Sequence, residues 1–320
     1  MRYILRRLVL VIPMLIGITI VSYSMLNLAP GDPMTAMMNP EDMAMLSDAQ
    51  IEAERERLGL NDPIVVRYFS WLREVVQGNL GYSYKTGRPV LEMVIERIPA
   101  TVLLAATAEA IAATVGITIG IYSGLRQYSF FDNVFTVFSF FAVSVPNFFF
   151  ALMGIFIFSV QLNWLPVFGM RTPGSGRGMS WDLLQHMILP VMALALPHIA
   201  SYMRYARGAV LDAKSADHVR TARAKGLADQ KVFSGHILRN AMIPMITIFT
   251  LSIPGLIGGS FVIESIFSWP GVGLMGYEAL QNRDYPLQLG VTLILACLVL
   301  LANLLSDILY GIVDPRIRYE

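Results

Sequence analysis

The chain has 320 residues, of which 55% are hydrophobic and 15% are charged, and its formal net charge is +1. Because soluble domains carry roughly 25% charged residues, this composition indicates a membrane protein. The near-neutral balance argues against a general electrostatic attraction to nucleic acid. The one cysteine, Cys297, lies inside an apolar run, which excludes a disulfide framework and a cysteine-rich metal site.

Six apolar runs are long enough to cross about 30 Å of hydrocarbon. They cover residues 8–28, 100–123, 134–160, 187–203, 243–263 and 287–313. The first run continues for about 21 residues, longer than the core of a cleavable signal, so we expect it to remain as a membrane helix that ends before Pro30. We therefore predict an all-α, polytopic membrane protein with six transmembrane helices.

The connection between the first two spans, residues 29–99, is too long to be a simple turn. Residues 47–60 predict a short charged helix, whose acidic side chains we interpret as a solvated face. Residues 64–76 predict a second helix. Its expected apolar face consists of Val65, Tyr68, Phe69, Leu72 and Val76. In the other large connection, 161–185, the Gly-rich residues 172–178 predict a flexible tip.

Lys and Arg gather in the connections on one side of the predicted bundle. That side holds Arg2, Arg6, Arg7, Arg126, Arg204, Arg207, Lys214, Arg220, Arg223, Lys225, Lys231, Arg239, Arg316 and Arg318. Outside the long 29–99 loop, the other side holds Arg171, Arg177 and Arg283. Because short cytoplasmic loops carry the excess of positive charge, we expect both termini and the insert 204–243 to be cytoplasmic.

Small residues and prolines recur within the spans. Gly116, Gly120 and Gly124 form two successive small-xxx-small steps, which allow another helix to approach closely. Prolines that interrupt the helical hydrogen bonds are Pro146, Pro190, Pro197 and Pro254. Such interruptions are tolerated where neighbouring groups or a water-filled path satisfy the freed carbonyls, so they favour a bundle with a pathway over a passive anchor.

Four ionisable residues lie at membrane depth: Glu109, His198, Glu264 and Asp307. Each is a functional candidate, because a charge in the bilayer is costly. The alternative for Glu109 and Asp307 is pairing with neighbouring helices to maintain packing. For His198 and Glu264 we expect contact with a wet central cavity.

No common catalytic signature occurs in the chain. The patterns G-x-x-x-x-G-K-[ST], H-E-x-x-H and G-x-S-x-G are all absent, which argues against a P-loop ATPase, a metalloprotease and a serine hydrolase. We therefore expect no catalytic residue, metal or cofactor in this chain, and we expect another chain to supply energy for any transport work.

The polar insert 215–244 separates two apolar runs. Its pattern predicts a short helix capped by Ser215, with Asp217 in the first turn, Lys225 in the last and Gly226 in the left-handed conformation. A helix of about ten residues is too short to be stable alone in water, so it needs a docking surface. The alternative is a solvated loop kept on the cytoplasmic side by its charge.

The insert resembles the EAA loop of binding-protein-dependent ABC transporter permeases. The matching positions are Arg220-Thr221-Ala222, Gly226, Ile237 and Pro244. The Glu and first Ala of the general pattern are replaced, so no contact of that Glu carries over. The segments TARAKGL and HILRNAMIP are similar to the loop of the dipeptide and oligopeptide permeases. Other segments like that family are LAPGDP (28–33), NLGYSY (79–84), RPVLEMVIERIPAT (88–101), GGSFVIESIFSWPGVG (258–273), RDYP (283–286) and DPRIRY (314–319).

This resemblance implies a type I importer in a bacterial or archaeal cytoplasmic (inner) membrane. The implied partners are a homologous second permease in a heterodimer, two cytoplasmic ATPases that hold ATP and Mg, and an extracytoplasmic binding protein that delivers a dipeptide or oligopeptide. Membrane lipid surrounds the chain, and no nucleic acid is implied. Alternatives are a same-family importer of glutathione, a nickel chelate or another peptide-like solute, and a membrane anchor without transport activity.

The resemblance also assigns parts of the chain. Residues 1–28 are the N-terminal helix, 29–99 the extracytoplasmic loop region, 100–313 the transmembrane core with the coupling loop 204–243, and 314–320 the cytoplasmic tail. The implied ATPase-coupling residues are Val219, Arg220, Thr221, Ala222, Arg223, Ala224, Lys225, Gly226 and Leu227. Val219 and Ala222 are expected to face the ATPase groove, and the basic residues its rim. Candidates for the pathway or its packing are Glu109, Pro146, Asn147, His198, Glu264, Trp269 and Asp307. We interpret Trp269 as a structural wedge rather than a substrate-stacking residue.

Overall fold

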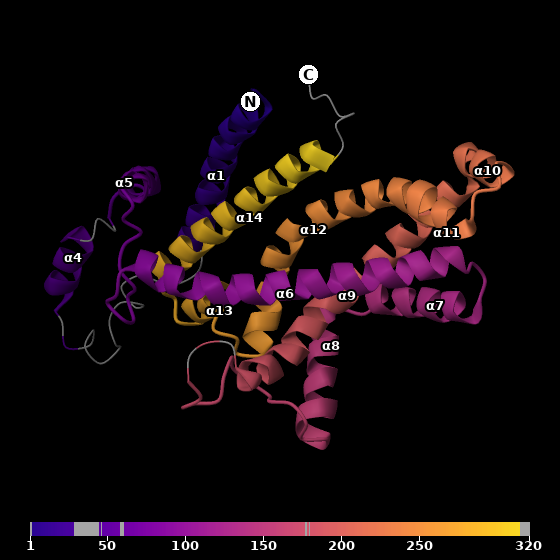
Figure 1. Ribbon diagram of the computed structural model, residues 1–320. Helices are drawn as coiled ribbons and strands as arrows, with labels where there is room; N and C mark the ends of the chain where they lie inside the picture. The colour runs from indigo at the N-terminus through magenta and orange to yellow at the C-terminus, as the bar shows by residue number, and fades with distance from the viewer. Residues whose placement is uncertain are drawn as a thin grey trace. The chain divides into compact units, whose positions relative to one another are not determined.

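The computed structural model describes residues 2–28, 45, 47–57, 61–176, 178 and 180–313, and within these ranges every regular element is a helix (Figure 1). The predicted helix stop at 29–33 and the tail 314–320 lie outside the described residues. The elements are α1 (Arg2–Leu28), α4 (Asp48–Arg57), α5 (Ile64–Val76), α6 (Val90–Leu125), α7 (Phe130–Ser144), α8 (Asn147–Gly154), η1 (Ile155–Gln161), α9 (Trp181–Ser215), α10 (Asp217–Ala224), α11 (Asp229–Val232), η2 (Phe233–Leu238), α12 (Arg239–Ile266), α13 (Val272–Gln281) and α14 (Tyr285–Val313).

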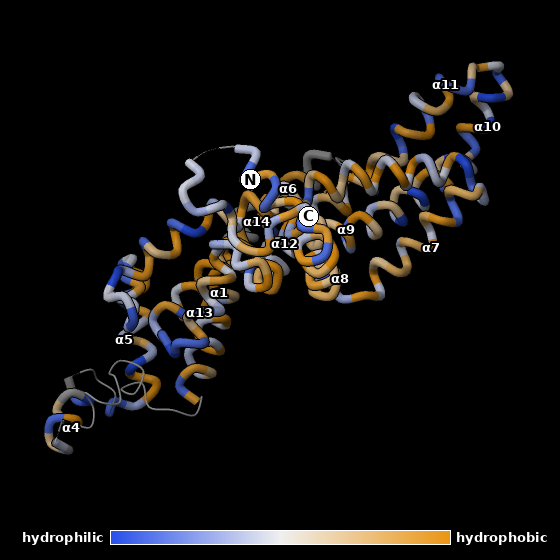
Figure 2. The backbone as a smooth tube through the Cα atoms, turned by 90° about the horizontal axis from the view of Figure 1, so that it is seen from below, coloured by the Kyte–Doolittle hydropathy of each residue, from blue (hydrophilic) through white to orange (hydrophobic). Residues whose placement is uncertain are grey.

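Within the described ranges, five helices are long and apolar enough to cross a membrane, and a bent pair brings the number to as many as six. The bent pair joins α7 to α8–η1 at an angle of 101°. It replaces the continuous span predicted over 134–160, because Val145 and Pro146 take extended backbone conformations with ψ of 129° and 140°. The prediction of an all-α, multi-span protein is confirmed. Figure 2 shows mainly hydrophobic residues along α1, α12 and α14.

The chain divides into two compact units. The first comprises Met1–Thr101 with Pro270–Leu298, and the second comprises Val102–Trp269 with Val299–Glu320. In the first unit, a core of buried side chains joins α6, α13 and α14. It contains Leu80, Val90, Met93, Val94, Val272, Met275, Ala279, Leu287 and Val291.

A buried carboxylate links two distant segments of the first unit. The Ser83 hydroxyl donates to Asp284 Oδ2 at 2.5 Å, and the Tyr84 N–H donates to Asp284 Oδ1 at 3.1 Å. Burial, followed by the nearby Asp284 charge, raises the pKa of the Tyr84 phenol to about 12. The NLGYSY and RDYP segments, which are about 200 positions apart, therefore meet in one hydrogen-bonded turn.

Helix α5 has the predicted bounds, but a different face is packed. Tyr68 is buried against α1, where its hydroxyl lies 3.0 Å from Thr19 Oγ1 and its ring 5.6 Å from that of Tyr23. Trp71 and Leu72 complete this contact. Val65, Phe69 and Val76 are exposed. Contact with Tyr23 turns the Tyr68–Trp71–Leu72 edge toward α1, so the predicted face is only partly packed within this chain.

In the second unit, α9 is the central helix and packs against α7, α8 and α12. The glycine row of α6 lies directly on it. A Cβ added to Gly120 would lie 2.5 Å from the Met203 carbonyl oxygen, and one added to Gly116 would lie 2.6 Å from that of Ile199. The predicted close helix approach is confirmed, and the contact requires the absence of a side chain.

The substitution Gly120→Ala tests this contact. We expect it to lower the free energy of unfolding by about 1–3 kcal/mol, because the new methyl group meets backbone of α9 that cannot move aside. Gly208→Ala is the matched control, since a Cβ there has nothing within 4 Å. Thermal unfolding in detergent measures both. Equal melting temperatures for the two variants would show that the glycine row does not set the helix spacing.

Candidate functional site

The candidate site is the segment from the end of α9 to the start of α12, which includes α10, α11 and η2. Ser215 is the last residue of α9, and its hydroxyl donates to the Asp212 carbonyl at 2.9 Å. The residue before α10 is Ala216, with φ −67° and ψ 146° and no capping side chain. The predicted Ser215 cap is therefore wrong, because α9 continues to Ser215, about three turns beyond the apolar run predicted over 187–203.

Gly226 ends the short helix as predicted. Its φ is +76°, its N–H donates to the Arg223 carbonyl at 2.9 Å, and the Leu227 N–H donates to the Ala222 carbonyl at 3.4 Å. A Cβ added to Gly226 would have nothing within 4 Å. A side chain at this position therefore costs free energy through backbone strain, and steric contact adds nothing.

The apolar side of α10 is buried within the chain. Val219 is 0% exposed and Ala222 is 4% exposed. They belong to a core that also contains Ala206, Val210, Ala213, Val232, Ile237, Ala241 and Met245. The expectation that Val219 and Ala222 face another protein is wrong, because these side chains attach α10 to α9, α11 and α12. The short helix thus has the docking surface that its length requires, within its own chain.

The opposite side of α10 is exposed and basic. Its exposed residues are Arg220, Thr221, Arg223, Ala224 and Lys225, followed by Gly226 and Leu227. The guanidinium of Arg220 lies 3.7 Å from Asp217, and that of Arg223 lies 3.9 Å from Asp229. Exposed ion pairs at these distances contribute little to stability, so the basic groups remain available to a partner. Figure 2 shows hydrophilic residues around α10.

A buried ion pair clamps α7 to α9 near this segment. Asp132, in the first turn of α7, has a side chain that is 1% exposed. Arg207 donates from Nε to Oδ1 at 2.7 Å and from Nη2 to Oδ2 at 2.9 Å. The Ser123 hydroxyl and the Tyr128 N–H donate to the same carboxylate. A two-pronged pair with additional donors is the arrangement in which a buried carboxylate is well satisfied.

A second polar contact joins three helices in the middle of the unit. Glu109 of α6 accepts hydrogen bonds from the Tyr202 hydroxyl of α9 and, at 2.8 Å, from the Ser252 hydroxyl of α12. Near it, the Ser306 hydroxyl of α14 donates to the Thr250 carbonyl. These hydrogen bonds are the contacts that the packing interpretation of Glu109 predicts, and a pathway role stays a prediction.

The remaining pathway candidates do not gather at a single site in the described chain. Glu264 is 0% exposed, so the prediction that a wet cavity reaches it is wrong for this chain. Trp269 is also 0% exposed, which fits a structural wedge, and its N–H donates to the Glu264 carbonyl at 2.8 Å. Half-buried candidates are His198 in α9, Asp307 in α14 and Asn147 at the start of α8. Pro146 forms the bend before α8. A pathway role for these residues stays a prediction.

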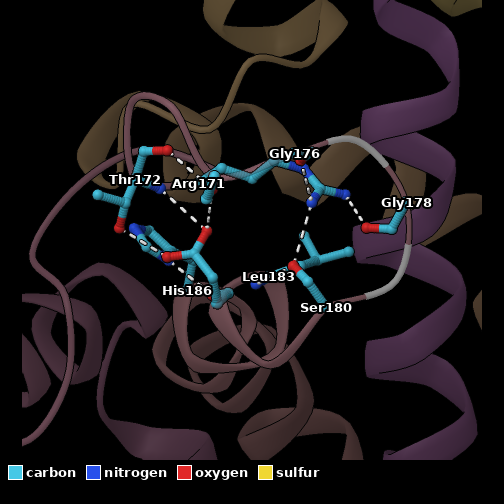
Figure 3. Close-up of polar contacts among 9 residues, drawn as sticks. Arg171, Thr172, Gly176, Gly178, Ser180, Leu183 and His186 are labelled. Carbon is cyan, nitrogen blue, oxygen red and sulfur yellow. Dashed lines mark hydrogen bonds and ion pairs between the residues drawn. The ribbon is translucent and has the colours of Figure 1, made fainter.

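The predicted flexible tip is organised by hydrogen bonds in its described part (Figure 3). Asp182 accepts from the Thr172 N–H at 3.0 Å, the Thr172 hydroxyl at 2.6 Å and the Ser175 hydroxyl at 2.7 Å. Arg171 donates to the Gly176 carbonyl and the Ser180 hydroxyl, both at 3.2 Å. Asp182 and Arg171 therefore supply the described part of the tip with partners that its composition does not indicate, and its flexibility stays a prediction.

Sequence reasoning missed the role of Asp132 and counted Arg207 only as a positive-side charge. A local signal did exist for Asp132. Ser129 and Asp132 have the spacing of a capping box, and the Asp132 N–H donates to the Ser129 hydroxyl at 3.2 Å. Nothing in the sequence indicates that Arg207, 75 positions later, completes the site.

Arg207→Ala tests the clamp. We expect it to lower the free energy of unfolding by about 3–5 kcal/mol, because it leaves the buried Asp132 carboxylate without its cation. Arg204→Ala, one turn earlier on α9, is the control, since its guanidinium lies 6.0 Å from the centroid of the Phe140 ring and has no carboxylate partner like Asp132 among the described residues. Thermal unfolding measures both variants, and Asp132→Asn combined with Arg207→Ala should recover part of the loss. A loss no larger than that of the control would contradict the clamp.

The chain is similar to known proteins in both sequence and fold. The family model described as "Binding-protein-dependent transport system inner membrane component" matches residues 116–319. The model for the N-terminal part of the same family of membrane components matches residues 1–105. The oligopeptide transport system permease protein AppB of Bacillus subtilis (strain 168) is 45% identical over 318 residues, 99% of each chain. The dipeptide transport system permease protein DppB of Escherichia coli (strain K12) is 37% identical over 340 residues, covering 100% of this chain and 99% of that protein.

Among solved structures, an inward-facing MetNI methionine ABC transporter aligns with a TM-score of 0.53 at 16% identity, covering 69% of this chain and 96% of that chain. This likeness shows a shared fold. The family matches over nearly the whole length agree with the resemblance drawn from the motifs. The chain therefore belongs to the binding-protein-dependent transport system inner membrane component family, as a multi-pass ABC transporter permease.

Proposed function

We propose that this chain is the permease subunit of an ATP-driven importer of short peptides. The observation that carries the proposal is the end-to-end similarity, over 99% of both chains, to a permease named for oligopeptide transport. The dipeptide permease of Escherichia coli supports the same substrate class. Peptide length preference belongs to the binding protein in this proposal, because that subunit selects the solute before the permease receives it.

The proposed assembly contains a homologous second permease, two cytoplasmic ATPases and an extracytoplasmic binding protein. ATP and Mg²⁺ belong to the ATPases, and this chain carries no catalytic residue. The positive-inside pattern supports an orientation with both termini and the loop 204–243 in the cytoplasm. Residues 29–99 and 161–185 then meet the binding protein. In this proposal residues 100–313 form the transmembrane core, which includes the coupling loop.

In the assembly, α10 transmits movement of the ATPases to the membrane helices. Its buried side contacts α9, α11 and α12, so a force on its exposed side reaches those helices through packed side chains. Arg220, Arg223 and Lys225 are the groups that we assign to the acidic rim of an ATPase groove. Gly226 sets the angle between α10 and the segment that returns to α12.

Reconstitution tests the function. Membranes that contain this chain, its second permease, both ATPases and the binding protein should hydrolyse ATP several-fold faster when the binding protein is loaded with peptide, and should accumulate labelled peptide. The unloaded binding protein is the control. Peptide-independent hydrolysis without uptake would favour a membrane anchor, whereas uptake of glutathione or a nickel chelate in place of peptide would change the substrate class.

Substitutions at Gly226 test coupling. The left-handed conformation costs a side-chain-bearing residue about 1–2 kcal/mol, less for Asn, and is least tolerated by a β-branched residue. We expect uptake to fall in the order Gly, Asn, Ala, Val, with hydrolysis affected less than uptake. Gly235→Val is the control, because a Cβ at that glycine also has nothing within 4 Å and its φ is not positive. Unchanged uptake by a normally assembled Gly226→Val transporter would contradict the coupling role.

A further inference from the structure

The first unit contains a pocket of 610 Å³ between α1, α5, the 79–84 turn and the start of α14. Four aromatic residues, Tyr23, Trp71, Tyr84 and Tyr285, contribute to its wall. Its volume lies in the range of roughly 300–1,000 Å³ that is usual for small-molecule sites. No residue of α10 lines it.

The pocket lies where two candidate membrane spans end. The candidate spans end at Leu28 in α1 and begin at Tyr285 in α14. Leu26, Asn27 and Tyr285 all contribute to the pocket wall. Because these two span ends meet in the same pocket, they belong to one face of the bilayer, where Tyr and Trp rings concentrate. A molecule in this pocket is therefore at headgroup level.

Arg67 supplies a cation to the pocket wall. It lines the pocket, and its Nε atom is buried without a hydrogen-bond partner among the described residues. A buried guanidinium donor with no acceptor is costly, and guanidinium geometry matches the oxygens of a phosphate. The positive charge of Arg67 in the pocket wall therefore favours an anionic ligand, and a phosphate is the anion that a guanidinium fits best.

The same pocket also presents negative charge. Glu74 and Asp62 contribute to its wall, and Glu74 is oriented by a 2.9 Å hydrogen bond from the Asn79 amide. The Tyr23 and Trp71 rings lie 5.5 Å apart, and π faces attract an ammonium group. The pocket wall thus offers a guanidinium for a phosphate, and carboxylates with aromatic rings for an ammonium group. A ligand that carries both a phosphate and an amine fits this arrangement.

We propose that this pocket binds the headgroup of a zwitterionic aminophospholipid, with its phosphate at Arg67 and its ammonium group toward Glu74 and the aromatic wall. Phosphatidylethanolamine has this chemistry, whereas phosphatidylglycerol has the phosphate without the amine. The acyl chains then lie along the exposed apolar surface of α1, which includes Val21 and Met25. The site tethers the α1–α5 pair to the bilayer.

Native mass spectrometry of the full-length chain in detergent tests the site. With phosphatidylethanolamine and phosphatidylglycerol titrated separately, we expect one tightly bound phosphatidylethanolamine and at least tenfold weaker binding of phosphatidylglycerol. Arg67→Gln should weaken phosphatidylethanolamine binding at least tenfold, because the phosphate loses its charge-assisted donors. Glu74→Gln should retain phosphate binding but lose the preference between the two lipids.

Arg283→Gln is the matched control, since Arg283 is an exposed arginine of the same unit that does not line the pocket. Thermal unfolding in lipid-free detergent identifies any variant that fails to fold, and Arg67→Lys then replaces Arg67→Gln. The proposal is overturned by equal lipid binding in wild type and the Arg67 variant, or by equal affinity for the two lipids. Complete displacement by an equimolar amount of water-soluble glycerophosphoethanolamine would also overturn it, because a free phosphate compound would then be the ligand.

Discussion

The contact between α6 and α9 is the constraint on which the second unit depends. At Gly116 and Gly120 no side chain separates the two backbones, so dispersion contacts form along the whole seam. Hydrophobic burial alone does not select one register between two apolar helices in lipid. Polar contacts do: Glu109 meets Tyr202 near one part of the seam, and Arg207 meets Asp132 further along α9. Close packing and hydrogen-bond geometry together determine one arrangement.

Helix α9 is long enough to connect the packed helices of the second unit to the α10 segment. The helix continues from Trp181 to Ser215 and passes directly into the α10 segment, to which Val210 and Ala213 are packed. Lys214 reaches back to the Leu125 carbonyl at 3.2 Å, which ties the end of α9 to the end of α6. Buried apolar side chains attach α10 to the end of α9, and the proposed coupling between the exposed basic edge and the membrane helices rests on this contact. A short helix that is unstable alone thereby becomes a rigid part of the chain.

Polar groups placed between segments far apart in the chain organise the first unit in the same way. Asp284 joins the 83–84 turn to the start of α14, and Thr101 accepts the Val272 N–H at 2.8 Å. The aromatic contacts of Tyr23, Tyr68 and Trp71 attach α5 to α1. The unit therefore keeps a polar, aromatic pocket at interface depth, where Arg67 and Glu74 lie beside rings suited to a headgroup.

Local pattern determined much of this protein. Hydrophobic run length predicted the all-helical, multi-span architecture, the glycine spacing predicted the close seam on α6, and Gly226 predicted the left-handed end of α10, because each depends on residues near one another in the chain. Tertiary structure alone decided the partners. The Pro146 bend, the inward side of α10, the α5 face turned to Tyr23, and the Asp132–Arg207 pair all depend on which distant segment lies opposite. That choice follows from the summed packing and polar satisfaction of several helices at once, a quantity that no single stretch of sequence contains.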